Sequence, residues 1–524
     1  MKGRRFGIAL VAVVAGIAGS FAAGAWWGDR TARRYDQWGP ERLISTAIDS
    51  VRANALDALP SDELLRRAVS GMLRELRDPY AALLRPEGAR EFRGLLGGNS
   101  QGLGLTLRRN GKHLGIARVF PGSPAASAQL RPGDRILSVN GVLVATHDPD
   151  RADAAGTKPA AATPSSDTSR LVVYRPLMGD TLSVTLKSGK WHVPATSDIV
   201  MLTRTVGYVA LTTISINSSE ELDDAIEELV DRGAKSVVLD LRGNGGGVLE
   251  EGVRIASLFL PRGSLVTSVT GKVGTPPLER RAPRGGRWED LPITMLVDAR
   301  TASAAEIVAA ALRDHDRALL VGEPTYGKGL VQRVVALTPE LSMRMTTARW
   351  MTPFGKVLER RHGSGIDALG GIRPDVFVPD AARPEAMATP PGLSEFAAAR
   401  MLRLADSAAA LALRESWSTE TLSLLESRLH SAIDSLVGPM RGNPTGRATA
   451  IAVATRLATV RVLEVGGKQD VVVRYQAAAD HALRAAIDVL VPGGQPFLVD
   501  AMPRTTIAPA PMKQKVAPSD SGPR

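Results

Sequence analysis

The 524-residue sequence contains no cysteine, only seven histidines and 4% aromatic residues. Without cysteine, disulfide scaffolds, thiolate zinc sites, iron–sulfur clusters and cysteine nucleophiles are excluded. Only one long uncharged apolar run occurs, which excludes a polytopic membrane protein. The remaining composition, 44% hydrophobic and 23% charged residues, is that of globular proteins, and the length predicts about three or four domains.

The charge balance favours no nucleic-acid partner. Lysine and arginine exceed aspartate and glutamate by 65 to 54, for a net charge of +11, but they are spread along the chain without a dominant cluster. Interleaved aromatic residues, which stack on bases, are also missing. We therefore interpret the basic excess as a surface property, and the sequence predicts neither a metal site nor a cofactor.

The amino-terminal segment predicts a membrane helix. The 22 residues from Phe6 to Trp27 carry no charge, enough to cross a bilayer. Lys2, Arg4 and Arg5 precede this run, and by the positive-inside rule they hold the amino end in the cytoplasm and place the remainder outside it. The alternative is a cleaved signal peptide, since residues 22–25 offer small-residue cleavage sites.

The secondary structure that the sequence predicts changes several times along the rest of the chain. Helical periodicity over residues 41–92 gives way to short strands and turns over 102–191, with a low-complexity stretch at 150–169, and then to alternating strands and helices over 206–379. Such alternation is typical of an α/β layer fold. We therefore expect an α/β multidomain protein with a helical carboxyl-terminal region. The expected segments are 1–35 membrane anchor, 40–98 helical prelude, 99–192 strand-rich domain, 193–380 α/β core, 390–493 helical region and 494–524 disordered tail.

The first motif is TASAAE, in which an expected strand at 293–298 leads into an expected helix at 303–313. Ser303 stands at the junction, where its hydroxyl lies at the positive end of the helix and the neighbouring amide groups are free to bind an oxyanion. Ser-x-x-Glu is also a capping box, so Ser303 could simply cap the helix. The motif alone does not decide between the two.

The second motif is Gly327-Lys328-Gly329. Small neighbours let the backbone pack closely around the lysine, and desolvation lowers the pKa of an amine toward that of a general base. In an expected strand over 330–335, Gln332 would share a face with Lys328 and could bind its amine. A solvated lysine in a glycine turn is the alternative.

The same segment has nearly the spacing of a nucleotide-binding P-loop. Residues 322–328 fit that spacing, but Gly329 replaces the Ser or Thr that holds magnesium. Apolar and β-branched residues follow where a helix should begin. A strand is therefore expected instead, and nucleotide binding is disfavoured.

The third motif is DLRGNGGG, residues 240–247, which follows an expected strand. Glycines permit dihedral angles at which successive N–H groups converge on an anion. The loop could therefore supply a second oxyanion donor, or it could be a flexible turn. The spacing lacks the third glycine of a dinucleotide-binding loop.

Together, DLRGNGGG, TASAAEI and VGEPTYGKGLVQ resemble the carboxyl-terminal processing peptidases, the tail-specific proteases of the S41 serine-peptidase family. The similarity covers roughly residues 43–379. It implies a serine endopeptidase without a cofactor, in which Ser303 is the nucleophile, Lys328 its general base and Gln332 the residue that positions the lysine. It also implies an oxyanion hole formed by the amides of Ala304 and Gly246.

The strand-rich segment resembles a PDZ domain. Gly102-Leu103-Gly104-Leu105 is similar to the carboxylate-binding loop, and GSPA at 122–125 with LRPGDRILSVNG at 130–141 matches the middle of such domains. The resemblance implies that a peptide adds to the sheet edge as an extra strand. The sequence departs from the pattern after Gly141, where HDPD at 147–150 and a low-complexity stretch replace the expected groove helix.

Together these features predict a protease anchored in the bacterial inner membrane, or exported after signal cleavage, that cuts extracytoplasmic proteins. Its partners would be protein or peptide substrates, the membrane, and in addition an adaptor protein or a second copy of the chain. The region after residue 394 has no counterpart in the resemblance and predicts either an interaction module or an extra layer on the protease. The competing hypothesis is a catalytically silent PDZ-type scaffold.

Overall fold

The computed structural model describes residues 40–57, 59–110, 113–144, 168–176, 178–359, 370–379, 395–415, 422–437, 444–465, 469–478 and 480–491. The expected membrane segment at 1–35 and the expected tail at 494–524 lie outside these ranges. None of the helices within them combines the length and the hydropathy that a bilayer span requires. The chain divides into two compact units, one containing residues 40–85 and 333–346 and the other containing the remaining described residues.

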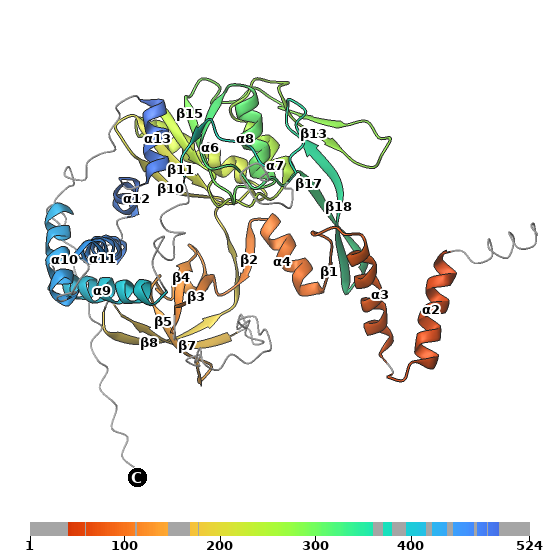
Figure 1. The fold of residues 1–524 in the computed structure, drawn as a ribbon, viewed down its shortest axis with the longest axis horizontal. Helices are drawn as coiled ribbons and strands as arrows, with labels where there is room; N and C mark the ends of the chain where they lie inside the picture. Colours follow the sequence, from red (N-terminus) through yellow and green to blue (C-terminus); the bar gives the residue numbers. More distant parts are fainter. Residues whose placement is uncertain are drawn as a thin grey trace, which may run out of the picture. The chain divides into compact units, whose positions relative to one another are not determined.

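The first unit consists of two helices and a strand that pairs with a long hairpin (Figure 1). Its elements are α2 (Pro40–Asn54), α3 (Ser61–Glu75), β1 (Ala82–Leu84) and parts of β17 (Leu330–Thr338) and β18 (Leu341–Met351). The carboxylate of Asp78 accepts hydrogen bonds from the N–H groups of Tyr80 and Thr346, at 2.9 and 2.8 Å. Residues 78–80 therefore form a turn that connects α3 to β18 through hydrogen bonds.

The second unit begins with a helix and the strand-rich domain. Its elements are α4 (Pro86–Leu96), β2 (Asn99–Gly102), β3 (Leu105–Asn110), β4 (His113–Val119), α5 (Pro124–Ser127), β5 (Arg135–Val139), β6 (Val142–Leu143), β7 (Thr168–Arg175), β8 (Asp180–Lys187) and β9 (Gly189–His192). Strands β3-β4-β5-β7-β8 form one antiparallel sheet, β6 pairs with β5, and β2 pairs with β9. Alternate residues of this sheet, such as Ile136, Leu171 and Val173, face a small apolar core.

The core of the second unit is a six-stranded sheet in the order β10-β11-β12-β15-β16-β19, parallel except for β10. Its strands are β10 (Thr196–Met201), β11 (Val206–Leu211), β12 (Ser236–Asp240), β15 (Ile293–Val297), β16 (Ala318–Gly322) and β19 (Val376–Phe377). Helices α6 (Ser218–Asp231), α7 (Leu249–Ser257) and α8 (Ala304–Asp314) connect the strands. The strand–helix alternation predicted for residues 206–379 is therefore present.

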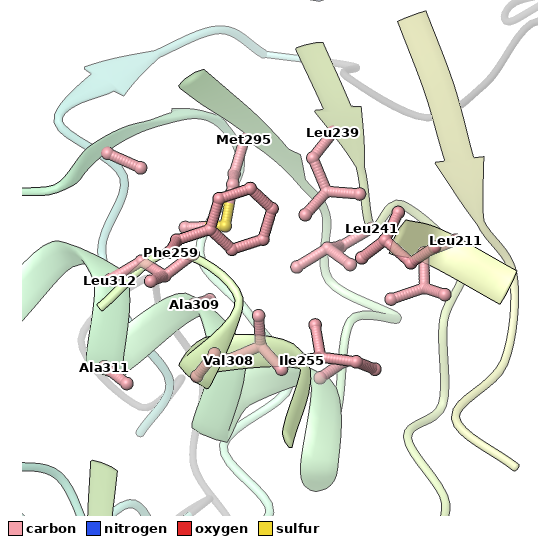
Figure 2. Packing of buried hydrophobic residues seen from close by; sticks show 14 of the residues in the cluster. Leu211, Leu239, Leu241, Ile255, Phe259, Met295, Val308, Ala309, Ala311 and Leu312 are labelled. Atoms are coloured by element: carbon pink, nitrogen blue, oxygen red, sulfur yellow. The ribbon is translucent and has the colours of Figure 1, made fainter. Parts of the chain in front are cut away.

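Burial on both faces explains why these strands are almost continuously apolar. Leu239, Leu241 and Met295 pack on one face against Ile255, Phe259, Val308 and Leu312 of the α7–α8 layer (Figure 2). The neighbouring residues of the same strands, such as Val238 and Leu296, point to the opposite face of the sheet and belong to a second hydrophobic cluster. Because side chains alternate along a strand, each strand serves both layers.

The spacing of apolar residues predicts a helix over residues 247–259, and the observed helix is shorter. It comprises Leu249–Ser257, because Gly247 has a φ of +155° and lies against the backbone of Ile214. A Cβ on Gly247 would come within 1.9 Å of Ile214 O. The glycine loop therefore packs against the backbone of Ile214, and the helix begins after this contact.

Helices dominate the carboxyl-terminal region, as predicted. They are α9 (Glu395–Arg414), α10 (Leu422–Val437), α11 (Pro444–Val465), α12 (Gln469–Ala477) and α13 (His481–Leu490). Helices α9 to α12 share a core of their own, whereas α13 covers the second face of the six-stranded sheet (Figure 1). A smaller antiparallel group, β13 (Leu265–Thr270) and β14 (Leu278–Arg281), pairs with residues 349–351 of β18.

Candidate active site

The three sequence motifs lie at the same edge of the six-stranded sheet. The DLRGNGGG loop follows β12, the TASAAE junction follows β15 and the GKG turn follows β16. These strands are neighbours and parallel, so their carboxyl ends meet at one edge, where ligand sites of open α/β sheets occur. Segments far apart in sequence are thereby brought together.

The first and third motifs are in direct contact. A Cβ on Gly246 would lie 2.5 Å from Ala302 O, 2.7 Å from Ala304 N and 2.9 Å from Ser303 Cβ. Any larger residue at this position would displace the Ser303 junction. With its φ of +86°, Gly246 has both a steric and a conformational reason to be glycine.

Ser303 has a strained backbone at the start of α8. Its φ of 58° and ψ of −120° lie outside the regions that residues with a Cβ normally occupy. Such strain persists only where the surrounding structure enforces it, and it is concentrated at functional sites. The side chain is partly exposed at the positive end of the helix.

The two predicted oxyanion donors differ in their present partners. Among the described residues, the N–H of Ala304 has no protein acceptor, as expected in the first turn of a helix. The N–H of Gly246 instead donates to Asn244 Oδ1 at 2.8 Å, while Asn244 is itself held by Leu211 O and the N–H of Ala302. Gly246 must therefore exchange this partner before it can donate to an oxyanion.

Lys328 lies in a closely packed backbone segment. Its carbonyl accepts a hydrogen bond from Trp350 Nε1 at 2.9 Å, and it forms an isolated antiparallel bridge with Glu359. A Cβ on Gly329 would come within 2.0 Å of Leu358 O. The flanking glycine thus permits the close backbone approach that the sequence predicts, and the lysine side chain is partly buried.

Gln332 lies on β17, which begins two residues after Lys328. Its amide Nε2 donates to Leu330 O at 3.4 Å. Because β17 is a strand and no helix follows the glycine turn, the P-loop alternative fails on structure as well as on the missing hydroxyl.

Glu306 is the functional residue that sequence reasoning missed, although the Ser-x-x-Glu pattern marked it. This fully buried carboxylate accepts the N–H of Ser303 and the N–H of Lys328 on one oxygen, both at 2.8 Å. Its other oxygen accepts the N–H of Gly327 at 2.7 Å and the hydroxyl of Thr325 at 2.5 Å. The backbones of the predicted nucleophile and base are therefore joined through one side chain.

Burial raises the pKa of Glu306, and the hydrogen bonds from Thr325, Lys328, Gly327 and Ser303 act in the opposite direction. The four donors occupy both oxygens. The carboxyl group thus has a structural role, since no position remains for it to contact a substrate.

We expect Glu306→Gln to lower the free energy of unfolding by about 2–4 kcal/mol, because the amide NH₂ must face two hydrogen-bond donors wherever it is placed. Proteolytic activity should fall by about a hundredfold in the folded protein, since the Ser303 and Lys328 segments lose their common anchor. Urea denaturation and rates corrected for the folded fraction measure the two effects.

Glu251→Gln is the matched control for this variant. Glu251 is a buried carboxylate on α7 that accepts hydrogen bonds from Ser219 and pairs with Arg254. The Glu251→Gln variant should have a lower free energy of unfolding, but its cleavage rate, corrected for the folded fraction, should not fall. Equal corrected rates in both variants would contradict the anchoring role of Glu306.

The predicted peptide-binding loop connects β2 and β3. The carbonyls of Leu103 and Gly104 accept the N–H groups of Ala125 and Phe120, both at 2.9 Å. Gly104, with a φ of +74°, packs so closely on Ser123 that a Cβ would come within 2.0 Å of it. Residues 145–167, where the sequence departs from the PDZ pattern, lie outside the described part of the chain.

In the part of the chain that the structure describes, no group of three or more histidine and acidic side chains could hold a metal ion. His315 ends α8, is exposed and has its Nε2 2.8 Å from Leu265 O. It lies at the opposite end of α8 from Ser303.

Comparisons with known proteins match residues 205–378 to Peptidase family S41 and residues 95–161 to the PDZ domain. The chain is 34% identical over 329 residues to a carboxyl-terminal-processing protease of Picosynechococcus, covering 60% of this chain and 72% of that protein. It is 29% identical over 338 residues to the carboxy-terminal processing protease CtpA of Bacillus subtilis, covering 64% of this chain and 68% of that protein.

Among solved structures, the photosystem II D1 C-terminal processing protease aligns with 27% identity and a TM-score of 0.37 over 64% of this chain and 90% of that one. The sequence relatives decide the assignment, because one of them is more than 30% identical over more than two thirds of its length. The chain thus belongs to the carboxyl-terminal processing proteases of peptidase family S41, and it is a serine-type peptidase with a PDZ domain.

Proposed function

We propose that the chain is an endopeptidase that uses Ser303 as nucleophile and Lys328 as general base to cleave extracytoplasmic proteins, by carboxyl-terminal processing or degradation. The observation that carries this proposal is the shared carboxylate oxygen of Glu306, which accepts the N–H groups of both residues. The strained backbone of Ser303 and the N–H of Ala304, which has no acceptor among the described residues, support the same site.

The proposed reaction is acyl transfer through a covalent intermediate. Ser303 Oγ attacks the scissile carbonyl carbon while its proton passes to the neutral Nζ of Lys328. The resulting oxyanion is held by Ala304 N–H and, after exchange of its partner, by Gly246 N–H. The amine product leaves with the proton from Lys328, and water then attacks the acyl-enzyme with Lys328 again as base.

Gln332 is proposed to position the amine of Lys328. Its side chain is partly buried on β17 and reaches Leu330 O at 3.4 Å, a long hydrogen bond that a rotamer change could replace. The Gly102–Leu105 loop of the PDZ domain is proposed to bind the peptide end of substrates.

The segment from Phe6 to Trp27 is proposed to anchor the protein in the inner membrane with its catalytic part outside the cytoplasm. An uncharged run of this length preceded by basic residues supports the proposal. We further propose the domain limits 40–98, 99–192, 193–380 and 390–493, with an adaptor protein or a second copy of the chain as additional partners.

Covalent labelling tests the proposed chemistry. A fluorophosphonate probe should modify Ser303, as located by peptide mass spectrometry, and the labelling rate should rise with pH because only the uncharged amine accepts the hydroxyl proton. An unfolded reporter should be cleaved in parallel. A scaffold without activity would give neither labelling nor cleavage, and labelling of a different serine would assign the nucleophile elsewhere.

A further inference from the structure

The last described helix is part of the protease core, although it lies beyond the residues that match the S41 family. Helix α13 packs on the sheet face opposite α7 and α8, with Leu483, Ala486 and Ile487 buried against Val238 and Leu296. The family match ends at residue 378. The carboxyl-terminal region therefore contributes a layer to the catalytic sheet.

The docking of this helix brings a carboxylate into the core. Asp480 caps α13, and its Oδ1 accepts the N–H of Leu483 at 3.0 Å. Its Oδ2 lies 2.8 Å from Nη2 of Arg242, whose side chain is 1% exposed. The cap of a distant helix thus forms an ion pair with the glycine-loop segment.

Arg242 is held between two carboxylates. Its Nη2 also lies 2.8 Å from Oδ2 of Asp240, and the same oxygen accepts the hydroxyl of Tyr208 at 2.7 Å. Burial acts to lower the pKa of Arg242, but Asp240 and Asp480 raise it well above its ordinary value. The guanidinium therefore stays charged, and in such a buried cluster the loss of one partner carries a large penalty.

The segment that Arg242 begins leads directly to Ser303. The next residue, Gly243, donates its N–H to Asp298 at 2.9 Å, and the carbonyl of Asn244 accepts the N–H of Ala302 at 2.9 Å. Gly246 then lies against Ala304 N and Ser303 Cβ. A displacement of Arg242 would be passed through this loop to the amides beside the nucleophile.

We propose that Asp480 is a positioning residue of the protease: through Arg242 it fixes the 242–247 loop in the geometry that stabilises the oxyanion. The inference rests on the proposed function of Ser303. It gives the carboxyl-terminal region a role in catalysis, because α13 must be docked for the loop to be held. Asp480 contacts neither substrate nor the reacting atoms.

Asp480→Asn in the full-length chain tests this proposal, because asparagine caps a helix as well as aspartate but removes one of the two negative charges that hold Arg242. We expect kcat to fall about tenfold or more with KM changed less than about twofold. Inhibition by a peptide aldehyde, whose adduct carries an oxyanion, should weaken by the factor lost in kcat. Amide exchange over residues 243–247 should accelerate.

Asp488→Asn is the matched control, since it removes the same charge from an exposed position on the same helix. It should behave as the unchanged protein in every measurement. Asp480→Glu retains the charge and should recover part of both kcat and aldehyde binding. If Asp480→Asn is unfolded at the assay temperature, the same measurements are made on Asp480→Glu, in which the carboxylate is displaced. Its losses of kcat and aldehyde binding should lie between the unchanged values of Asp488→Asn and the losses expected for Asp480→Asn.

Unchanged kcat, aldehyde inhibition and loop exchange in folded Asp480→Asn would overturn the inference. So would a loss of kcat with full aldehyde binding, because the defect would then lie outside oxyanion stabilisation. Full activity of Ser303→Ala would instead refute the proposed chemistry, so the two failures are distinguishable.

Discussion

Ser303→Ala is expected to lower the rate of reporter cleavage by a factor on the order of 10⁴–10⁶, because the proposed acyl-enzyme forms on the hydroxyl that this substitution removes. The fold should persist, because the carboxylate of Glu306 binds the backbone N–H of Ser303 at the amino end of α8, and alanine retains that N–H. Alanine therefore keeps the anchor and loses only the hydroxyl. Steady-state cleavage of an unfolded reporter, with melting temperature measured in parallel, checks both expectations.

Ser257→Ala is a suitable control for this variant. Ser257 is a buried serine on α7 whose hydroxyl donates to Val253 O within its own helix. Its removal should change stability slightly and leave the cleavage rate unaltered. Cleavage by Ser303→Ala at the rate of the unchanged protein, in preparations free of contaminating protease, would exclude Ser303 as nucleophile.

Lys328→Arg is expected to reduce the rate by about 10²–10⁴, because a guanidinium stays charged and cannot accept the proton of Ser303. For the unchanged protein, the rate should increase with pH as the amine of Lys328 loses its proton, and this increase should be absent in the variant. A pH–rate profile of both proteins makes the comparison.

Two further variants separate a chemical role of Lys328 from a structural one. Lys356→Arg, at an exposed position in the turn after β18, should retain the full rate and its pH dependence. Lys328→Ala should be inactive, and an added small amine should restore part of its activity by taking the place of the side chain. If Lys328→Arg kept the rate and its pH dependence, the base would have to be another residue.

The order and type of the core elements could be predicted from the sequence. Strands β11, β12 and β15 are buried along their whole length and mostly apolar, and the intervening helices have amphipathic spacing. The three motifs, which follow β12, β15 and β16, were visible for the same reason, since a loop that follows a buried strand stands out by its glycines and polar residues. The exact start of α7 could not be predicted, because it depends on the contact of Gly247 with Ile214.

The residue types of the site can be read from the sequence: a glycine loop, a serine at a strand–helix junction and a lysine between glycines, in the order found in one protease family. The contacts that join them become visible only in the folded chain. Glu306 appeared in the sequence as half of a helix cap, and Asp480 as one charge in a helical region of unknown role. Each acts on residues distant in sequence, and such contacts depend on how parallel strands and their covering helices pack, which local periodicity does not encode.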